Sequence, residues 1–587
     1  MLKWLSFLYG KDTAKAYMPK LKRILKIYYA HKTPETIKND KNVDPEERFT
    51  EKDLILITYG DLVHGKERSP LKTLAKTCYT HLKYINTLHI LPFFPYSSDR
   101  GFSIIDFETV DPHLGTWDDI HDLEHHYQLM FDGVINHASS KSRWFQEFLD
   151  GSPAYKDFFT SFGSPEELTP EQRNKLFRPR TSDILTEFKT INGPIYVWTT
   201  FSKDQIDLNF KNPKVLMKVI EILLLYVRHG ADIIRLDAIT YLWDEPGTRG
   251  ANLRQTHEIV KLFRDILDVV APSVSIVTET NVPHKENISY LGNGHDEAQM
   301  VYNFALSPLV LYTFYKGDST ALSKWLRGLK KVSNSTTFFN ILDTHDGVGL
   351  LGAKNILKKA DIDFIIQRAE EHGGYISHKA GKAGIKEPYE INITWYSALN
   401  LEESGEDMAF QVKRVIASRS IALAIKGVPG IYLHGLIGTK NDIEAVLKTK
   451  SKRAINRTVI DSELLNDAIN DPKSKLFHIV SSLHKIFKVR TKKRAFHPNG
   501  DQKVLMISPS VFTVLRVSPE GDQHILTLTN VTDRTGKIEI PLKGLGTNEE
   551  DWYDLISGEE LKSQNQRLSV KLEPYDVIWL EPLSEIK

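Results

Sequence analysis

Short apolar runs alternate with amphipathic or irregular segments over most of the chain. They begin after a polar stretch at 33–52. Nearly continuous apolar runs of this length are typical of parallel strands that are buried on both faces. The eight expected strands are 54–59, 88–92, 128–135, 232–236, 274–278, 300–303, 337–342 and 430–433.

Eight strands separated by helical segments predict an α/β fold of the (β/α)8 TIM-barrel type with long insertions. An open, doubly wound sheet is the competing architecture. Long loops inside a compact domain are usually functional, and in a barrel the loops that follow strands surround the active site. The expected units are a helical extension at 1–52, the barrel at 53–150 and 207–490, an insertion after the third strand at 151–206, an acceptor-loop insertion after the seventh at 347–400, and a small antiparallel β domain at 491–587.

The N-terminal extension contains one segment with helical spacing. Leu21, Ile24, Leu25 and Tyr28 recur among basic residues. This pattern predicts a helix packed on the outside of the fold, with a helix lying on a membrane surface as the alternative. The longest uninterrupted apolar run, 222–227, is far too short to span a membrane, and no secretory signal pattern is present. We therefore expect a cytoplasmic protein with no membrane partner.

Composition and charge exclude several classes of protein. Lys and Arg number 76 and Asp and Glu 75, which leaves a formal net charge of +1. A chain this close to neutral lacks the electrostatic footprint that binds nucleic acid or an anionic membrane. The single cysteine, Cys78, excludes a disulfide within the chain and any metal site built from several thiolates.

Four of the expected strands end in polar residues that a purely structural barrel does not need. The third ends in DGVINH (132–137), the fourth in RLDA (235–238), the fifth in TETN (278–281) and the seventh in DTHDG (343–347). Each acid taken alone has a structural explanation as a helix cap. Together, three of these acids converge on one mouth of the predicted barrel: Asp237, Glu279 and Asp346.

Such a trio suits glycosyl transfer with retention of configuration. One carboxylate attacks the anomeric carbon to form a glycosyl ester, and another holds the proton for the leaving oxygen. Arg235, two residues before Asp237, is expected to keep that nucleophile ionised. Glu279 is the candidate acid/base, and Asp346 is expected to bind sugar hydroxyls and favour the distorted ring.

The set DGVINH, RLDA, a strand-terminal Glu and THD resembles the α-amylase superfamily over about 54–457. Within that superfamily the chain is similar to the sucrose phosphorylase group. The motifs that carry this similarity are LITYGD, LPFFPYSSDRGFSIIDF, LGTWDD, VWTTFSKDQIDLN, DTHDGVG, and GVPGIYLHGLIGTKND with AINR.

The resemblance implies roles for individual residues. Asp237 would be the nucleophile, Glu279 the acid/base and Asp346 the stabiliser of the transition state. The positions implied in glucose binding are Asp99, His137, Arg235, His345 and Arg457, with Phe102 as an apolar platform and Phe201, Gln205 and Tyr241 lining the pocket. Arg180 matches a phosphate-contacting arginine, a role that suits the forked guanidinium, and a surface ion pair is its alternative.

The implied reaction converts a small-molecule α-glucoside and inorganic phosphate into α-glucose 1-phosphate and an alcohol. Two inversions at the same carbon give net retention. The resemblance implies no cofactor. It also implies no metal, because this group usually lacks the calcium ion that many amylases bind at the position of Asn136. The oligomeric state stays open.

The acceptor is indicated by departures from the sucrose phosphorylase pattern. Asn281 replaces a common His and Ala454 replaces an acid. Both departures, with EPGT (245–248) and YEINITW (389–395), resemble the glucosylglycerate and glucosylglycerol phosphorylases. The expected order of substrates is glucosylglycerate, then glucosylglycerol, then sucrose or its phosphate. The segment 350–359, with Lys354, is expected to shape acceptor choice, although no arginine for a glycerate carboxylate is evident there.

Two other functions compete with this hypothesis. A hydrolase or a transglucosidase could use the same scaffold and would be indifferent to phosphate. A catalytically inactive amylase-like protein could serve as a scaffold or a carbohydrate-binding subunit. The complete trio of acids argues against the inactive protein.

Overall fold

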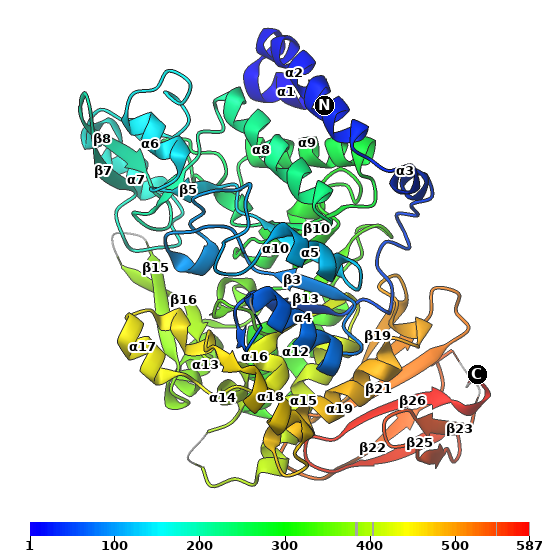
Figure 1. The fold of residues 1–587 in the computed structure, drawn as a ribbon. Coiled ribbons are helices and arrows are strands. Elements are labelled where there is room, and N and C mark those ends of the chain that lie inside the picture. The colour runs from blue at the N-terminus through cyan, green and yellow to red at the C-terminus, as the bar shows by residue number, and fades with distance from the viewer. Residues whose placement is uncertain (68, 382–384, 402–403, 547–548, 586–587) are drawn as a thin grey trace.

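A closed barrel of eight strands forms the centre of the molecule (Figure 1). The computed structural model describes residues 1–587 apart from 68, 382–384, 402–403, 547–548 and 586–587. Every neighbouring pair of barrel strands is parallel. In chain order the barrel strands are β1 (Ile55–Thr58), β3 (Thr87–Ile90), β4 (Gln128–Gly133), β10 (Ala231–Leu236), β11 (Ser275–Thr278), β12 (Met300–Tyr302), β13 (Thr337–Ile341) and β17 (Val428–Tyr432).

The predicted (β/α)8 barrel is confirmed. Each of the eight apolar runs coincides with one barrel strand. The first strand, β1, pairs with both β3 and β17, so the sheet closes on itself, and the open doubly wound sheet was the wrong alternative. Five of the six residues of β10 are buried, as expected for a strand covered on both faces.

Helices cover the outside of the barrel, and their starts follow from local sequence. Helix α8 (Pro213–Arg228) begins where the side chain of Asn212 accepts a hydrogen bond from the backbone of Lys214, with proline at the first helical position. Asparagine caps a helix in this way, and proline there loses no intrahelical bond. The helices that flank the barrel also include α4 (Pro70–His81), α5 (Trp117–Glu124), α9 (Arg254–Val270), α11 (Leu306–Lys316), α12 (Thr320–Gly328), α15 (Met408–Ala424) and α19 (Lys475–Arg490).

The N-terminal extension forms helices α1 (Leu2–Tyr9), α2 (Lys11–Ala30) and α3 (Pro34–Lys41). The four apolar residues predicted to face inward on α2 are all buried, and the helix packs against α8 and α9. The prediction of an outer packed helix is therefore confirmed, because protein already covers the face that a membrane would need. Among the helices that the structure describes, none combines the length and apolar character needed to cross a bilayer.

Two insertions carry small sheets of their own and lie on the same side of the molecule in Figure 1. Between β4 and β10, strands β6 (Ser161–Phe162), β8 (Gly193–Trp198) and β7 (Leu185–Thr190) form one sheet. Between β13 and β17, the strands β14 (Val348–Gly349), β16 (Lys386–Asn392) and β15 (Tyr375–Ala380) form another. The two sheets therefore follow the carboxyl ends of the third and seventh barrel strands.

The C-terminal region is antiparallel β structure, as predicted. Its larger sheet has the order β19 (Asp501–Ser508), β20 (Val511–Val517), β21 (His524–Asn530), β26 (Val577–Pro582), β23 (Asp551–Asp554) and β24 (Glu560–Lys562). A second, two-stranded sheet pairs β22 (Gly536–Pro541) with β25 (Arg567–Leu572). The fully buried Arg516 attaches this region to the barrel by donating to the carbonyl oxygen of Ala424 at 2.9 Å.

Candidate active site

A narrow cavity at the carboxyl end of the barrel brings most of the predicted site residues together. Its volume is about 60 Å³, far below the roughly 300–1,000 Å³ typical of ligand pockets. The predicted residues that line this cavity are Asp99, Phe102, His137, Arg180, Phe201, Gln205, Asp237, Tyr241, Glu279, His345 and Asp346.

The first of the three acids, Asp237, follows β10 and is held by Arg235. In the register of the neighbouring strands Arg235 lies opposite Asp132 of β4, and its guanidinium contacts both that carboxylate and, at 2.8 Å, Asp237. Tyr302 accepts a further hydrogen bond from Arg235 at 3.0 Å. Only 2% of Arg235 is exposed, and it lies behind the cavity wall. This arginine therefore positions Asp237 from the side of the carboxylate that faces away from the cavity.

Glu279 occupies the equivalent place on the next strand, β11. Leu236 lies opposite Thr278, so Asp237 and Glu279 come next to each other at the ends of adjacent strands. A Glu279 carboxylate oxygen accepts from the backbone N–H of Ala238 at 3.1 Å. Ala238 has a left-handed backbone with φ of 49°, which is costly for alanine and aims that N–H at the acid. Strands about 4.8 Å apart suit the roughly 5–5.5 Å carboxyl separation of retaining pairs.

The protonation of this pair depends chiefly on burial. Burial raises the pKa of Asp237, with Arg235 opposing the rise and Glu279 adding to it. Burial also raises the pKa of Glu279. Arg235 acts in the expected direction, towards the ionised form of Asp237, and it also contacts Asp132. The two acids lose their protons as a coupled pair. Arg235 contacts Asp237 directly, whereas no described side chain forms an ion pair with Glu279.

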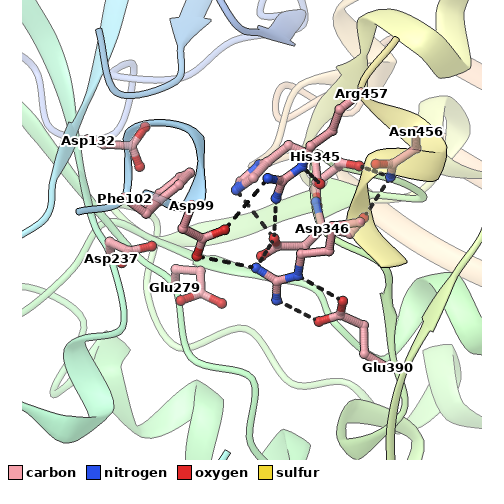
Figure 2. Close-up of polar contacts among 12 residues, drawn as sticks. Asp99, Phe102, Asp132, Asp237, Glu279, His345, Asp346, Glu390, Asn456 and Arg457 are labelled. Atoms are coloured by element: carbon pink, nitrogen blue, oxygen red, sulfur yellow. Dashed lines mark hydrogen bonds and ion pairs between the residues drawn. The ribbon is translucent and has the colours of Figure 1, made fainter. Parts of the chain in front are cut away.

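Asp346 has the opposite environment. Its carboxylate contacts Arg453 at 2.6 Å and Arg457 at 3.3 Å, and Arg453 also binds Glu390 with contacts of 3.1 and 2.8 Å (Figure 2). Burial alone would raise the pKa of Asp346, but the two arginines outweigh it and lower the pKa below its usual range. Asp99 lies across from the same arginines, 3.6 Å from Arg457. Asp346 is thus the acid of the trio held ionised.

Aromatic and imidazole rings form the floor of the cavity. Phe102 stacks on His345 with ring centres 4.8 Å apart and an angle of 3°. The ring of His137 lies 2.8 Å from the carbonyl oxygen of Phe102, to which the side-chain amide of Gln205 donates at 3.1 Å. Burial lowers the pKa of His137 to about 4, so this imidazole is neutral and can exchange hydrogen bonds with a sugar hydroxyl.

The insertion after the third strand supplies one wall. Phe201 packs edge-on against Tyr241 with centres 5.4 Å apart, and the guanidinium of Arg180 lies 5.6 Å from the centre of the Phe201 ring. Arg180 donates to the carbonyl oxygen of Pro179, but no carboxylate in the described part of the chain pairs with it. The structure therefore contradicts the alternative that Arg180 forms a surface ion pair.

The chain is similar in sequence to known proteins. A family model described as "Alpha amylase, catalytic domain" matches residues 76–368. A glucosylglycerate phosphorylase of Allomeiothermus silvanus is 41% identical over 581 residues, which cover 99% of this chain and 98% of that protein. The chain belongs to the phosphorylases of the α-amylase family.

More distant relatives agree with this membership. A sucrose phosphorylase of Streptococcus mutans is 29% identical and covers 82% of this chain and 96% of its own length. The crystal structure of a sucrose 6F-phosphate phosphorylase from Thermoanaerobacter thermosaccharolyticum superposes with a TM-score of 0.71 at 24% identity, covering 89% of this chain and 98% of its own. The crystal structure supports the fold of this chain. The sequence relatives confirm the family resemblance that was predicted from the motifs.

Three residues that were not predicted for the site, Arg453, Tyr389 and Glu390, also line the cavity of this phosphorylase. Signals for them existed. Arg453 directly precedes Ala454, where the usual acid is absent, and YEINITW includes both other residues. Lys354, expected to shape acceptor choice, is exposed and does not line the cavity.

No set of three or more His, Cys, Asp or Glu side chains in the described residues is arranged to hold a metal ion. At the position where many amylases bind calcium, the side-chain amide of Asn136 instead donates to Asp207 at 3.3 Å. Asp207 also accepts from the backbone of Thr200 at 3.0 Å. These contacts join the end of β4 to β9 (Gln205–Asp207), which carries Gln205 into the cavity.

We predict that Arg453→Gln makes kcat/KM fall more steeply at the acidic end of the pH profile. Removing one of the two cations beside Asp346 raises the pKa of that carboxyl, so less of it is ionised in acid. One pKa unit corresponds to about a tenfold loss of kcat/KM on the acidic limb. Arg453→Lys, which keeps the charge, should retain most of the wild-type profile. An acidic limb that is the same in Arg453→Gln and the wild type would contradict the role given to Arg453.

Proposed function

We propose that this protein is a glucosylglycerate phosphorylase that transfers the glucosyl group to inorganic phosphate with retention of configuration. The observation that carries the proposal is Arg180, a guanidinium that faces the cavity of Asp237 and Glu279 with no described carboxylate paired to it. Such a group is suited to an anionic ligand, because its fork donates two charge-assisted hydrogen bonds to phosphate.

In the first half-reaction, a carboxylate oxygen of Asp237 attacks the anomeric carbon of the glucosyl group. The bond from that carbon to the glycerate oxygen breaks, and Glu279 gives its proton to the leaving oxygen. The product is a glucosyl ester of Asp237. Asp346, ionised between its arginines, holds sugar hydroxyls and stabilises the positive charge that develops on the ring.

In the second half-reaction, a phosphate oxygen attacks the same carbon. The ester bond breaks and returns the carboxylate of Asp237, and the ionised Glu279 receives the proton from the attacking phosphate. The second inversion restores the α configuration in α-glucose 1-phosphate. Phosphate must act before water does, which favours a narrow site with Arg180 facing inward.

The choice of glycerate as acceptor has two supports. The relative that is 41% identical over nearly the whole chain is named a glucosylglycerate phosphorylase. The guanidinium of Arg180, which lines the cavity and pairs with no described carboxylate, also suits an acceptor that bears a carboxylate. Asn281 lines the same cavity at the position that departs from the sucrose phosphorylase pattern.

Glucosylglycerol, sucrose and sucrose 6′-phosphate are the alternative substrates. A hydrolase or transglucosidase would use the same acids but would gain nothing from phosphate. A cytoplasmic location is part of the proposal, and Cys78, which is free and buried, is compatible with the reducing conditions there.

The test of the proposal measures phosphate released from α-glucose 1-phosphate in the presence of glycerate, glycerol, fructose or fructose 6-phosphate. We expect release to depend on glycerate, with a kcat/KM for glycerate at least about tenfold above that for glycerol, because a lost charge-assisted contact costs about that factor. Release that is independent of any acceptor and is matched by free glucose would identify a hydrolase. A preference for another acceptor in the panel would replace glycerate.

We predict that Asp237→Asn lowers kcat by at least about 10³-fold, because the amide cannot form the ester. Glu279→Gln should lower kcat by about 10²- to 10⁴-fold and remove the alkaline limb of the pH profile. Burial raises the pKa of Glu279, so in the wild type that limb lies above the ordinary range of a glutamic acid and activity falls as the acid form is lost. Thermal melting checks that both variants fold. An alkaline limb that persists in Glu279→Gln would remove Glu279 from the acid/base role.

We predict that Arg180→Ala raises the KM for phosphate by about 10- to 100-fold while hydrolysis of the glucosyl ester changes much less. The matched control is Arg173→Ala. Arg173 belongs to the same insertion but pairs with Asp183 at 2.9 Å outside the cavity. Equal losses of phosphorolysis and hydrolysis in Arg180→Ala would place Arg180 outside the phosphate site.

A further inference from the structure

A second cavity lies between the barrel and the C-terminal sheets. It is a groove of about 590 Å³ bounded by α12 with the segment that follows it, the start of β13, and strand β19. We call it the junction groove. This volume is within the roughly 300–1,000 Å³ of small-molecule sites. None of its lining residues lines the catalytic cavity. It is therefore a separate place in the molecule.

The junction groove is strongly basic. Its lining includes a single acid, Asp501. The chain as a whole has nearly equal numbers of acids and bases, 75 and 76, so the excess here is local. The basic residues that line the groove are Arg327, Lys330, Lys331, Lys426, Lys503 and Lys543.

These cations lack acidic partners within the described part of the chain. Lys503 donates to the carbonyl oxygen of Gly544 at 2.8 Å and Arg327 contacts the sulfur of Met506 at 3.4 Å. No ion pair joins any of the six to a described carboxylate. A cluster of like charges without counter-charges raises the free energy of the protein and attracts a mobile anion.

Lys426 shows most directly the excess of positive charge in the groove. It lies half-buried between α15 and β17, and burial together with the positive charges of Lys331 and Arg516 lowers its pKa to about 8. Asp501, the acid in the groove lining, offsets only part of this effect and forms no ion pair with Lys426 among the described residues. An anion in the groove would stabilise its charged form.

The groove also offers an acceptor for a hydroxyl group. Asn303 is fully buried and lines the groove, and its side-chain oxygen has no hydrogen-bond donor among the described residues. Its amide nitrogen is already used, donating to Asn340 at 2.9 Å. Buried polar atoms are nearly always satisfied, so an unsatisfied oxygen in a cavity wall indicates a donor supplied by a ligand or by solvent.

We propose that the junction groove binds a small phosphorylated sugar or polyol, with the phosphate among the lysines and a hydroxyl on Asn303. Lysine is an effective phosphate binder because its compact charge adapts to the oxygen atoms. Apolar side chains such as Leu326, Leu505 and Ile507 complete the lining and suit the carbon skeleton of such a ligand. This proposal does not depend on the function proposed for the catalytic cavity.

The test is a calorimetric titration of the full-length protein with glucose 6-phosphate, and separately with inorganic phosphate and with glucose, at constant ionic strength. The groove variant is Lys331→Gln/Lys426→Met/Lys503→Gln. Its matched control is Lys15→Gln/Lys22→Gln/Lys26→Gln, which removes three exposed lysines of α2 on a distant part of the molecule. Lys426→Met alone should melt at or above the wild-type temperature, because it removes a half-buried cation without a partner.

We expect saturable binding of glucose 6-phosphate by the wild type and the control, and binding at least about tenfold weaker in the groove variant. Glucose alone should not bind in the groove. Absence of saturable binding in the wild type, or equal affinities in all three proteins, would overturn the proposal. An equal loss in the control would reduce it to non-specific charge. Inorganic phosphate that binds as tightly as glucose 6-phosphate and loses that affinity in the groove variant would overturn the polyol class.

Discussion

The site depends on one buried guanidinium. Arg235, on β10, contacts Asp132 of the neighbouring strand β4 and Asp237 just past its own strand, and it is only 2% exposed. Breaking a buried ion pair on one side costs about 3–5 kcal/mol, because it leaves an unpaired charge in a medium of low polarity. Strands β4 and β10 are therefore held in one register, and that register fixes where Asp237 points. His89, 2.8 Å from the second oxygen of Asp132, extends the same network to β3.

The same charges give the three acids of the site different tendencies to ionise. Asp237 shares its arginine with Asp132, Glu279 accepts a backbone N–H but has no described ion pair, and Asp346 lies between two arginines. Burial acts on all three alike, so the differences in pKa come from the cations and their competitors. A double displacement needs this arrangement, because it requires one carboxylate to attack, one acid to donate a proton and one carboxylate to stay charged throughout.

The two insertions supply site residues that the barrel strands do not. The barrel supplies the acids from rigid strand ends, whereas Arg180 comes from the insertion between β4 and β10, and Glu390 from the insertion between β13 and β17. Glu390 holds Arg453, and Arg453 in turn holds Asp346, so the second insertion acts on the chemistry through a chain of two ion pairs. Loop segments on a rigid scaffold can vary in this way without disturbing the core, which is how a barrel serves many substrates.

The sequence by itself determined the barrel, the C-terminal antiparallel strands, the family and the three acids. Buried parallel strands need nearly continuous apolar runs, and the acids stand at their ends in short motifs, so both features are local. Only the tertiary structure decided that Arg453 joins Glu390 to Asp346, that Arg235 divides its charge between Asp132 and Asp237, and that Lys354 lies away from the cavity. Those outcomes depend on the directions of side chains brought together from distant positions, and on burial, which a linear pattern of residues does not specify.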